Sequence, residues 1–422
     1  MAFATDKRRN VAALLAVAST ALMVWFGTGL EPRWPMLWLA PIPVLLFASR
    51  SSWWSAGLAA GLAWFIGNLN LWNYLKVVDV PVVARLAIFA VPALVFALAV
   101  LLFRALMRRG ATWSALFAFP ATWVSCEYLF ELISPHGTGG NLSYSQLNFL
   151  PVLQLASVTG PWGISFLLLF FPVGIAIGLH LCNSAPKRAR RIAGVGLGVT
   201  VLVLLFGAVR LMLPVEGPKV RVGLLASDQP ANVDPADEGP ETVRLFHEYA
   251  TEAEKLAVRG AQVIVLPEKL GVTVDPDTGD TDALFQALAD RTRSQIVVGL
   301  IHVVPPVKYP AVKYNEALVF TAGAPQQSYH KHHMLPPFES PLEPGTELTL
   351  LGESSGTRGI AICKDMDFTP LSRQYGEAGT GLMLVPAWDF VLDRWLHGHM
   401  SIMRGVEDGF SIVRAAKQGY LT

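Results

Sequence analysis

Long apolar segments fill the first half of the chain, and most approach the roughly 20 residues that a helix needs to cross a bilayer. We count seven such segments, at residues 11–30, 34–48, 53–75, 82–106, 113–133, 162–181 and 192–213. Pro41, Pro43, Pro92 and Pro120 interrupt some of them, which helix bundles in lipid tolerate where neighbours satisfy the freed carbonyls. The pattern therefore predicts a membrane domain of about seven transmembrane helices over residues 1–214.

After about residue 220 the pattern changes to short runs of β-branched and aliphatic residues. Two of these runs, at 220–225 and 263–266, are separated by a helical stretch at about 241–259. Further runs follow at 296–300, 317–320, 359–362 and 381–385. Alternation of strands and helices predicts an α/β domain over residues 215–422, with its reactive residues at strand ends.

Composition agrees with this division and narrows the class of protein. With 52% hydrophobic and only 15% charged residues, the chain of 422 residues is too apolar for an ordinary soluble globule. The net charge of +1 gives no electrostatic signature of nucleic-acid binding, so we expect no nucleic-acid partner.

Basic residues mark alternate connections between the apolar segments and so predict an orientation. The clusters are Lys7 to Arg9, Arg50, Arg104 with Arg108 and Arg109, and Lys187 to Arg191. Since Lys and Arg of short loops stay on the cytoplasmic side, a cytoplasmic N-terminus and seven spans deliver residues after 213 to the opposite face. The first segment lacks a small-residue cleavage site and is interpreted as an anchor. Core helices of a soluble protein would not produce this alternation.

The cysteines and histidines give no metal or disulfide signature. Cys126, Cys182 and Cys363 lie far apart without a CxxC spacing. His330, His332 and His333 crowd one loop, but such near neighbours seldom converge on one ion, so we expect a solvated or substrate-facing loop and no metal.

Three polar residues stand at the ends of apolar runs or in a loop between them, where side chains are exposed yet rigidly held. Glu268 follows the run at 263–266, Cys363 follows the run at 359–362, and Lys331 lies in the cationic loop between them. Each has an ordinary explanation when taken alone, as a buried small hydrophobe or a solvated charge.

Their order resembles the nitrilase superfamily, whose catalytic triad is Glu, Lys and Cys. The stretch Val385-Pro386-Ala387-Trp388 with its following helix, and Tyr144-Ser145-Gln146 in the membrane region, make the whole chain similar to the apolipoprotein N-acyltransferase family. That resemblance implies a multi-span α-helical membrane domain followed by a nitrilase-like αββα sandwich. It also implies a bacterial inner-membrane protein with its catalytic domain on the periplasmic side.

A mechanism follows from the residue types and from the resemblance. Cys363 would form an acyl thioester, Glu268 would act as base and acid, and Lys331 with the backbone N–H of Lys364 would hold the oxyanion. The family implies a phospholipid acyl donor and a diacylglyceryl-lipoprotein acceptor, with no cofactor. Glu339 falls on an acidic position that the family places beside the site, and Trp388 belongs to the matching stretch.

The chain also departs from the family pattern. Lys364 and Asp365 stand where the family usually has Tyr and Glu; a second lysine near the sulfur would favour thiolate, and Asp365 keeps a carboxylate on a shorter arm. The family's last strands and final transmembrane helix have no counterpart before Thr422, so we expect an α/β domain that is incomplete at its C-terminal end.

Two other functions remain open on the sequence alone. A membrane-tethered amidase would use the same triad to hydrolyse a small C–N substrate, and an inactive member would serve only in interactions, although all three triad positions are intact. Glu127, inside an apolar segment, is either functional or a partner in a hydrogen bond of the helix bundle.

Overall fold

The computed structural model describes residues 2–214, 217–227, 240–275, 279–305, 311–353 and 356–422. The contacts within the chain divide it into two compact units. The first comprises Met1–Ile133 with Gly140–Leu213, and the second comprises Ser134–Gly139 with Pro214–Thr422. The boundary expected between residues 214 and 215 adjoins residues 215–216, which lie outside the described part.

The regular elements described in the first unit are all helices, joined by loops. Its elements are α1 (Ala2–Gly27), α2 (Pro41–Arg50), α3 (Trp53–Asn68), η1 (Leu69–Leu71), α4 (Trp72–Val77), α5 (Val82–Arg108), α6 (Thr112–Ile133), η2 (Leu142–Gln146), α7 (Leu150–Leu153), α8 (Ala156–Leu181) and α9 (Pro186–Met212). Among the described residues, five helices are long and apolar enough to cross a membrane: α1 from Arg8 onward, α5, α6, α8 and α9. Many of their large apolar side chains are exposed, including Leu94 and Leu202.

The remaining two apolar segments form shorter helices than the sequence pattern predicts. The segment at 34–48 becomes helical only at Pro41, because proline has no N–H to donate to a preceding turn and is tolerated at the first helical position. The segment at 53–75 is divided by η1 just after Asn68, whose side chain donates to the Trp64 carbonyl at 2.8 Å. Neither segment forms one helix of membrane-crossing length.

The second unit alternates strands with helices. Its strands are β1 (Val222–Leu224), β2 (Val263–Val265), β3 (Val272–Val274), β4 (Gln295–Val304), β5 (Val312–Phe320), β6 (Gln327–His330), β7 (Leu350–Glu353), β8 (Gly356–Ile360), β9 (Thr380–Trp388) and β10 (Ser411–Lys417). Its helices are α10 (Pro240–Val258), α11 (Gly279–Thr292), η3 (Cys363–Asp367), α12 (Thr369–Glu377) and α13 (Arg394–Asp408).

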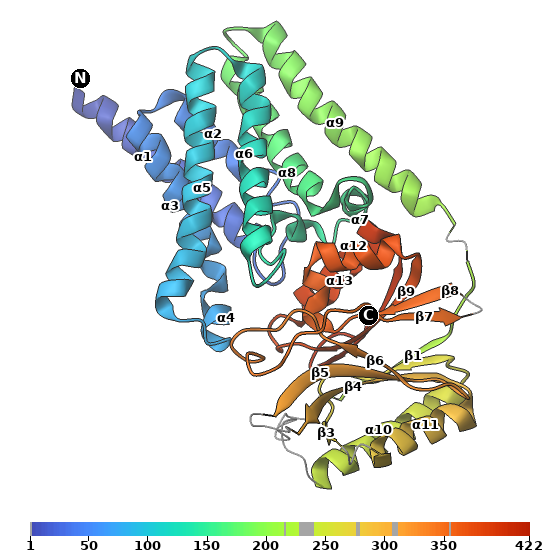
Figure 1. The fold of residues 1–422 in the computed structure, drawn as a ribbon. Coiled ribbons are helices and arrows are strands. Elements are labelled where there is room, and N and C mark those ends of the chain that lie inside the picture. Colours follow the sequence, from blue (N-terminus) through green and yellow to red (C-terminus); the bar gives the residue numbers. More distant parts are fainter. Residues whose placement is uncertain (1, 215–216, 228–239, 276–278, 306–310, 354–355) are drawn as a thin grey trace. The chain divides into compact units, whose positions relative to one another are not determined.

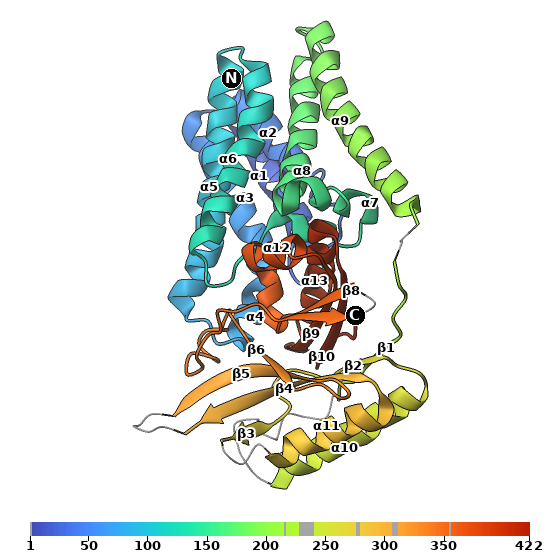
Figure 2. The same ribbon diagram turned by 45° about the vertical axis from the view of Figure 1, so that its right-hand side comes forward.

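These elements form two sheets with helices on their outer faces. The first sheet has the order β1-β2-β4-β5-β6, with β3 also paired to β4, and the second has the order β10-β9-β8-β7. Helices α10 and α11 cover the first sheet, and α12 and α13 lie on the far side of the second (Figure 1, Figure 2). The αββα sandwich that the resemblance implies is thus observed.

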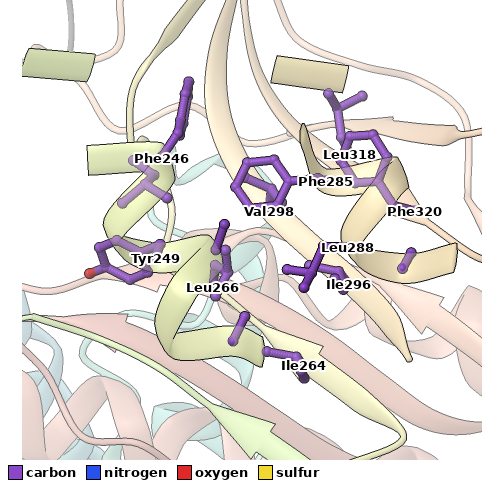
Figure 3. Packing of buried hydrophobic residues seen from close by; sticks show 14 of the residues in the cluster. Phe246, Tyr249, Ile264, Leu266, Phe285, Leu288, Ile296, Val298, Leu318 and Phe320 are labelled. Carbon is purple, nitrogen blue, oxygen red and sulfur yellow. The ribbon is translucent and has the colours of Figure 1, made fainter. Parts of the chain in front are cut away.

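Apolar packing explains the layers. Helix α10 directs Phe246, Tyr249, Ala250 and Ala253 toward the sheet at a spacing of three to four residues, as expected of an amphipathic helix. They pack with residues of α11 and with the outward face of β4 and β5, as Figure 3 shows. Each large side chain buried here contributes about 1.5–3 kcal/mol.

Every run that the sequence pattern assigned to a strand overlaps one, although the runs at 220–225, 263–266 and 359–362 extend beyond it, and the helical stretch at 241–259 corresponds to α10. Four strands were not predicted: β3, β6, β7 and β10. The strands β3, β6 and β7 have only 3, 4 and 4 residues, and β10 carries a buried arginine. The hydrophobic pattern of all four is therefore weak.

Candidate active site

Strand ends position the three residues that the sequence singled out. Glu268 follows β2, Lys331 is the first residue after β6, and Cys363 opens η3 shortly after β8. Their exposed fractions are 1%, 2% and 8%. The first two therefore come from one sheet and the cysteine from the other, and all three are buried.

The ammonium group of Lys331 lies between two buried carboxylates. Lys331 Nζ donates to Glu268 Oε1 at 2.8 Å and to Glu339 Oε2 at 2.8 Å. Burial alone would lower the pKa of Lys331, but the charges of Glu268 and Glu339 outweigh burial and hold it well above its usual value. The lysine is thus a fixed positive charge in a dry environment.

Two residues of this cluster were not predicted. Asn315 of β5 donates one amide group to Glu268 Oε1 at 2.6 Å and to Glu339 Oε1 at 2.9 Å. Lys269 donates to Glu339 Oε1 at 2.7 Å. A lysine directly after Glu268 was the available signal for Lys269, whereas Asn315 lies in a polar part of β5, beside Tyr314 and Glu316, where nothing set it apart.

Glu339, which the resemblance singled out, lies in the loop that follows β6. Burial alone would raise its pKa, but the charges of Lys331 and then Lys269 hold the pKa well below the usual range. Its carboxylate also accepts from the backbone N–H of Leu335 at 2.8 Å, so the same residue orders its own loop.

Cys363 has a strained backbone and a protonated thiol. Its φ is +44°, in a left-handed region that side chains other than glycine rarely adopt. The sulfur lies 3.5 Å from the Trp388 carbonyl oxygen and 3.9 Å from Arg414 Nη2. Burial, with the charge of Glu268, raises the thiol pKa well above its usual value, although Lys331 and Arg414 act in the opposite direction. The nucleophile therefore needs a base.

Arg414 of β10 is a buried cation that the sequence did not reveal. Its guanidinium pairs with both carboxylate oxygens of Asp389, which follows β9. Burial would lower its pKa, but Asp389 raises it beyond its usual value. An arginine inside an apolar strand run was the only signal. The guanidinium of Arg414 thus lies beside the Cys363 sulfur, and the carboxylate that pairs with it is Asp389, which is not one of the two that pair with Lys331.

Asp365 organises the loop around the cysteine. Its fully buried carboxylate accepts from the Tyr329 hydroxyl at 2.8 Å and from the backbone N–H groups of Ile362 and His333 at 3.1 and 2.9 Å. It also accepts from the His332 backbone N–H at 3.2 Å. This carboxylate joins the loop after β6 to the turn that presents Cys363.

Lys364 contacts a segment remote in sequence. Its ammonium group donates to the carbonyl of Pro135 at 2.5 Å and to that of Met334 at 3.2 Å, and lies 3.2 Å from His136 Nδ1. We call Ser134–Gly139 the strap; it belongs to the second unit although α6 precedes it. Burial lowers the Lys364 pKa. The ammonium that was expected to act on the sulfur is thus directed to the strap.

Trp388 is the last residue of β9 and contacts both the cysteine and two lysines of the site. The ammonium nitrogens of Lys269 and Lys417 lie 5.5 and 4.5 Å from the centre of its ring, at cation–π distances. Its carbonyl contacts the sulfur of Cys363. Trp388 therefore joins the cysteine to the lysines of the site.

In the first unit, Glu127 takes the hydrogen-bonding role that was one of its two interpretations. Its carboxylate accepts from the Leu142 backbone N–H at 2.8 Å and from Asn141 at 3.3 Å. Gln146, from the matching stretch in the membrane region, accepts from Trp38 Nε1 at 2.8 Å. All three cysteines are free thiols.

The arrangement combines a buried thiol, a buried carboxylate and a fixed cation. Such a combination suits nucleophilic attack on a carbonyl through a covalent intermediate. A carbonyl oxygen that gains charge during the attack would be stabilised by Lys331.

Two family models match this chain and together cover most of it. Residues 20–174 match the model described as the apolipoprotein N-acyltransferase N-terminal domain. Residues 224–420 match the model of the carbon-nitrogen hydrolase family.

Individual relatives carry the first of these names. A protein of Geobacter metallireducens named apolipoprotein N-acyltransferase is 27% identical over 433 residues, which cover 91% of this chain and 80% of the relative. One of Haemophilus ducreyi with the same name is 24% identical over 446 residues, which cover 96% and 81%. Among solved structures, Saccharomyces cerevisiae Nit3, a member of branch 10 of the nitrilase superfamily, is 19% identical with a TM-score of 0.41, covering 48% of this chain and 79% of Nit3.

Proposed function

We propose, since the chain belongs to the apolipoprotein N-acyltransferase family, that it transfers a fatty acyl group from a phospholipid to the N-terminal diacylglyceryl-cysteine of lipoproteins. The protein is a multi-pass bacterial membrane protein, and we assign the reaction to the periplasmic side of the inner membrane. The observation that carries the proposed chemistry is the buried cluster of Glu268, Lys331 and Glu339 beside the thiol of Cys363.

In the first half-reaction, Glu268 removes the proton from the Cys363 thiol and the sulfur attacks the ester carbonyl of the phospholipid. The carbonyl oxygen becomes an oxyanion, which Lys331 stabilises together with the backbone N–H of Lys364. The carbon–oxygen bond to the glycerol then breaks, and the departing alkoxide takes the proton from Glu268. The products are an acyl thioester on Cys363 and a lysophospholipid.

In the second half-reaction, the neutral amine of the acceptor attacks the thioester carbonyl. The nitrogen loses a proton to Glu268, the carbon–sulfur bond breaks, and the Cys363 thiolate recovers the proton. A thioester is more reactive toward an amine than the starting ester, which explains the use of a thiol. Glu339, Asn315 and Lys269 position Lys331 and Glu268 and do not enter the bond changes.

Loading from lipid alone tests this proposal. The full chain in detergent, incubated with phospholipid and no acceptor, is expected to carry a long-chain acyl group on Cys363 that hydroxylamine removes. Intact-mass spectrometry detects the added group. A diacylglyceryl-peptide with a free amine is then expected to discharge it, with the acyl group appearing on that amine.

Matched variants make the result specific. Cys363→Ala is expected to remain unloaded, whereas Cys182→Ala, which removes an exposed thiol, loads as the unmodified chain does. Lys331→Met is expected to load at least ~100-fold more slowly. If Cys363 stays unmodified with every phospholipid while small amides are cleaved, the hydrolase is the correct function and the acyltransferase is excluded.

A further inference from the structure

A cluster of two histidines and one glutamate lies outside the candidate active site. His302 is on β4, Glu316 on β5 and His330 at the end of β6. Glu316 pairs directly with His330 across the two strands, and His302 pairs with Tyr314, two residues before Glu316. The three side chains therefore share one face of the sheet.

Each of the three offers a ligand atom, and these atoms all lie within 4.8 Å of one another. His302 Nδ1 is 3.0 Å from Glu316 Oε2, and His330 Nε2 is 3.2 Å from Glu316 Oε1. Among the described residues, His302 Nδ1 is a buried atom without a hydrogen-bond partner, despite its short distance to Glu316. Both imidazoles thus direct a ring nitrogen toward the same carboxylate, as two histidines and a glutamate around one ion would.

The surroundings of the histidines are those of a metal site. The other ring nitrogen of His302, Nε2, lies 3.2 Å from Asp275 Oδ1. A carboxylate on the second nitrogen is the usual partner of a metal-bound histidine, because it fixes the tautomer and the ring orientation. The ring of His330 stacks on Tyr314 with centroids 4.1 Å apart. Both rings are thus held in place before any ion binds.

We propose that His302, Glu316 and His330 form a binding site for a divalent transition-metal ion, with Zn²⁺ as the best fit. Two imidazoles and a carboxylate are a frequent protein ligand set for Zn²⁺, with water in the fourth position. Imidazole ligands disfavour Mg²⁺ and Ca²⁺, which prefer oxygen. The side chains of His302 and His330 are 20% and 31% exposed, so an ion and a water molecule can reach the site.

The ion would connect the strands that carry part of the candidate active site. Asn315 and Lys331 are the sequence neighbours of Glu316 and His330, and successive residues of a strand point to opposite faces. An ion bound on one face would fix β5 relative to β6 and thereby fix the spacing of Asn315 and Lys331 on the other. The proposed role is structural and does not depend on the acyl transfer.

A second group with suitable residue types is a poorer candidate. Asp389, Asp393 and His397 also bring their ligand atoms together. Arg414 already occupies both oxygens of Asp389, and its fixed charge would repel a cation. The cluster on β4, β5 and β6 is the one that we assign.

Metal binding to the full chain tests the proposal. The protein is purified in detergent with a tag that contains no histidine, stripped with a chelator and dialysed against metal-free buffer. We expect about one equivalent of Zn²⁺ by elemental analysis, and with Co²⁺ the visible absorption of a four- or five-coordinate ion. Zn²⁺ is also expected to raise the unfolding temperature, because an ion that binds only the folded state stabilises it.

Variants locate the ion. His302→Ala with His330→Ala is expected to abolish binding, and Asp275→Asn to weaken it about 10- to 100-fold, since it removes only the carboxylate partner of His302. Asp275 is half-exposed, so this variant keeps the test valid if the double variant fails to fold. His247→Ala and His332→Ala, which change histidines outside the cluster, should bind as the unmodified chain does. Absence of binding in the unmodified chain, or equal binding by all variants, would overturn the proposal.

Discussion

At the scale of single residues, the candidate active site holds its lysine charged and its cysteine protonated. Lys331 has two carboxylates within 2.8 Å, whereas the Cys363 thiol is buried near one of the same carboxylates. The lysine therefore stays charged and the cysteine stays protonated near neutral pH. Since the charge of Lys331 is fixed and the Cys363 thiol must lose its proton before it can attack, the site suits a mechanism with a separate base.

This asymmetry predicts opposite effects of one substitution. Burial raises the pKa of Cys363, and the negative charge of Glu268 adds to that effect. Below its pKa the thiol is protonated, so removing the charge in Glu268→Gln should lower the pKa and increase the thiolate fraction at a given pH. Alkylation of Cys363 by iodoacetamide is expected to become severalfold faster at pH 8, while acyl transfer falls at least ~100-fold because the base is lost.

Peptide mass spectrometry measures the label on Cys363 separately from that on Cys126 and Cys182, which are also free thiols. The rate is followed as a function of pH, and the midpoint of the Glu268→Gln profile should lie at lower pH than that of the unmodified chain. Slower alkylation of the variant at every pH would contradict the electrostatic role of Glu268. A misfolded variant would instead label Cys363 with the pH profile of a free thiol, whose pKa is about 8.5, and would lose its cooperative thermal unfolding transition.

At the scale of elements, the strap and η3 are joined by polar contacts. Besides the contacts of Lys364, the hydroxyl of Thr138 donates to the Asp367 carbonyl at 2.7 Å, and the Thr138 backbone N–H donates to the same oxygen at 3.0 Å. These contacts extend along η3 from the residue after the nucleophile. The side chain of Lys364 therefore serves as a structural contact between η3 and the strap.

We predict that Lys364→Met loosens the strap. The methionine keeps much of the apolar stem but cannot donate to the carbonyls of Pro135 and Met334, and loss of hydrogen bonds from a charged donor costs about 1–3 kcal/mol. Hydrogen–deuterium exchange of residues 134–139 should accelerate, with acyl loading of Cys363 slowed. Lys255→Met, at an exposed position of α10, provides the control and should change neither. Unchanged exchange in Lys364→Met would show that other contacts suffice to hold the strap.

At the scale of the whole molecule, the number of membrane crossings decides on which side the second unit lies. In the part of the chain that the structure describes, five helices have the length and composition to cross, and the sequence pattern suggests two further crossings by the segments that contain α2 and α3. Both totals are odd. In either case Gly217 is expected on the face opposite to Arg109, because three crossing helices, α6, α8 and α9, lie between them.

Reporter fusions test this topology. A reporter active only outside the cytoplasm should work at Gly217 and fail at Arg109. At Arg50 the same reporter distinguishes the two totals, since this residue is cytoplasmic only if α2 and α3 both belong to crossing segments. A cytoplasmic signal at Gly217 would exclude the proposed reaction with periplasmic lipoproteins.

The sequence by itself determined the features that depend on neighbouring residues. Apolar runs predicted the two kinds of domain. The residues directly after two of these runs singled out Glu268 and Cys363, because a strand end is recognisable from the chain alone, and Lys331 was singled out in the cationic loop between them. The resemblance added Glu339 and Trp388. The lengths of α2 and α3 were misjudged, since hydrophobicity does not report where prolines and asparagines interrupt the backbone ladder.

Only the tertiary structure decided which polar groups meet. Asn315 reaches both carboxylates, and Arg414 reaches the sulfur, because the strand registers and the packing of two sheets bring distant residues together. The same registers gather His302, Glu316 and His330 on one face, whereas the side chains of His332 and His333 contact Glu347 and Asp365 instead. The direction of the Lys364 ammonium toward the strap was likewise fixed by packing. Hydrophobic periodicity encodes burial residue by residue, but a contact between side chains depends on the relative placement of whole elements.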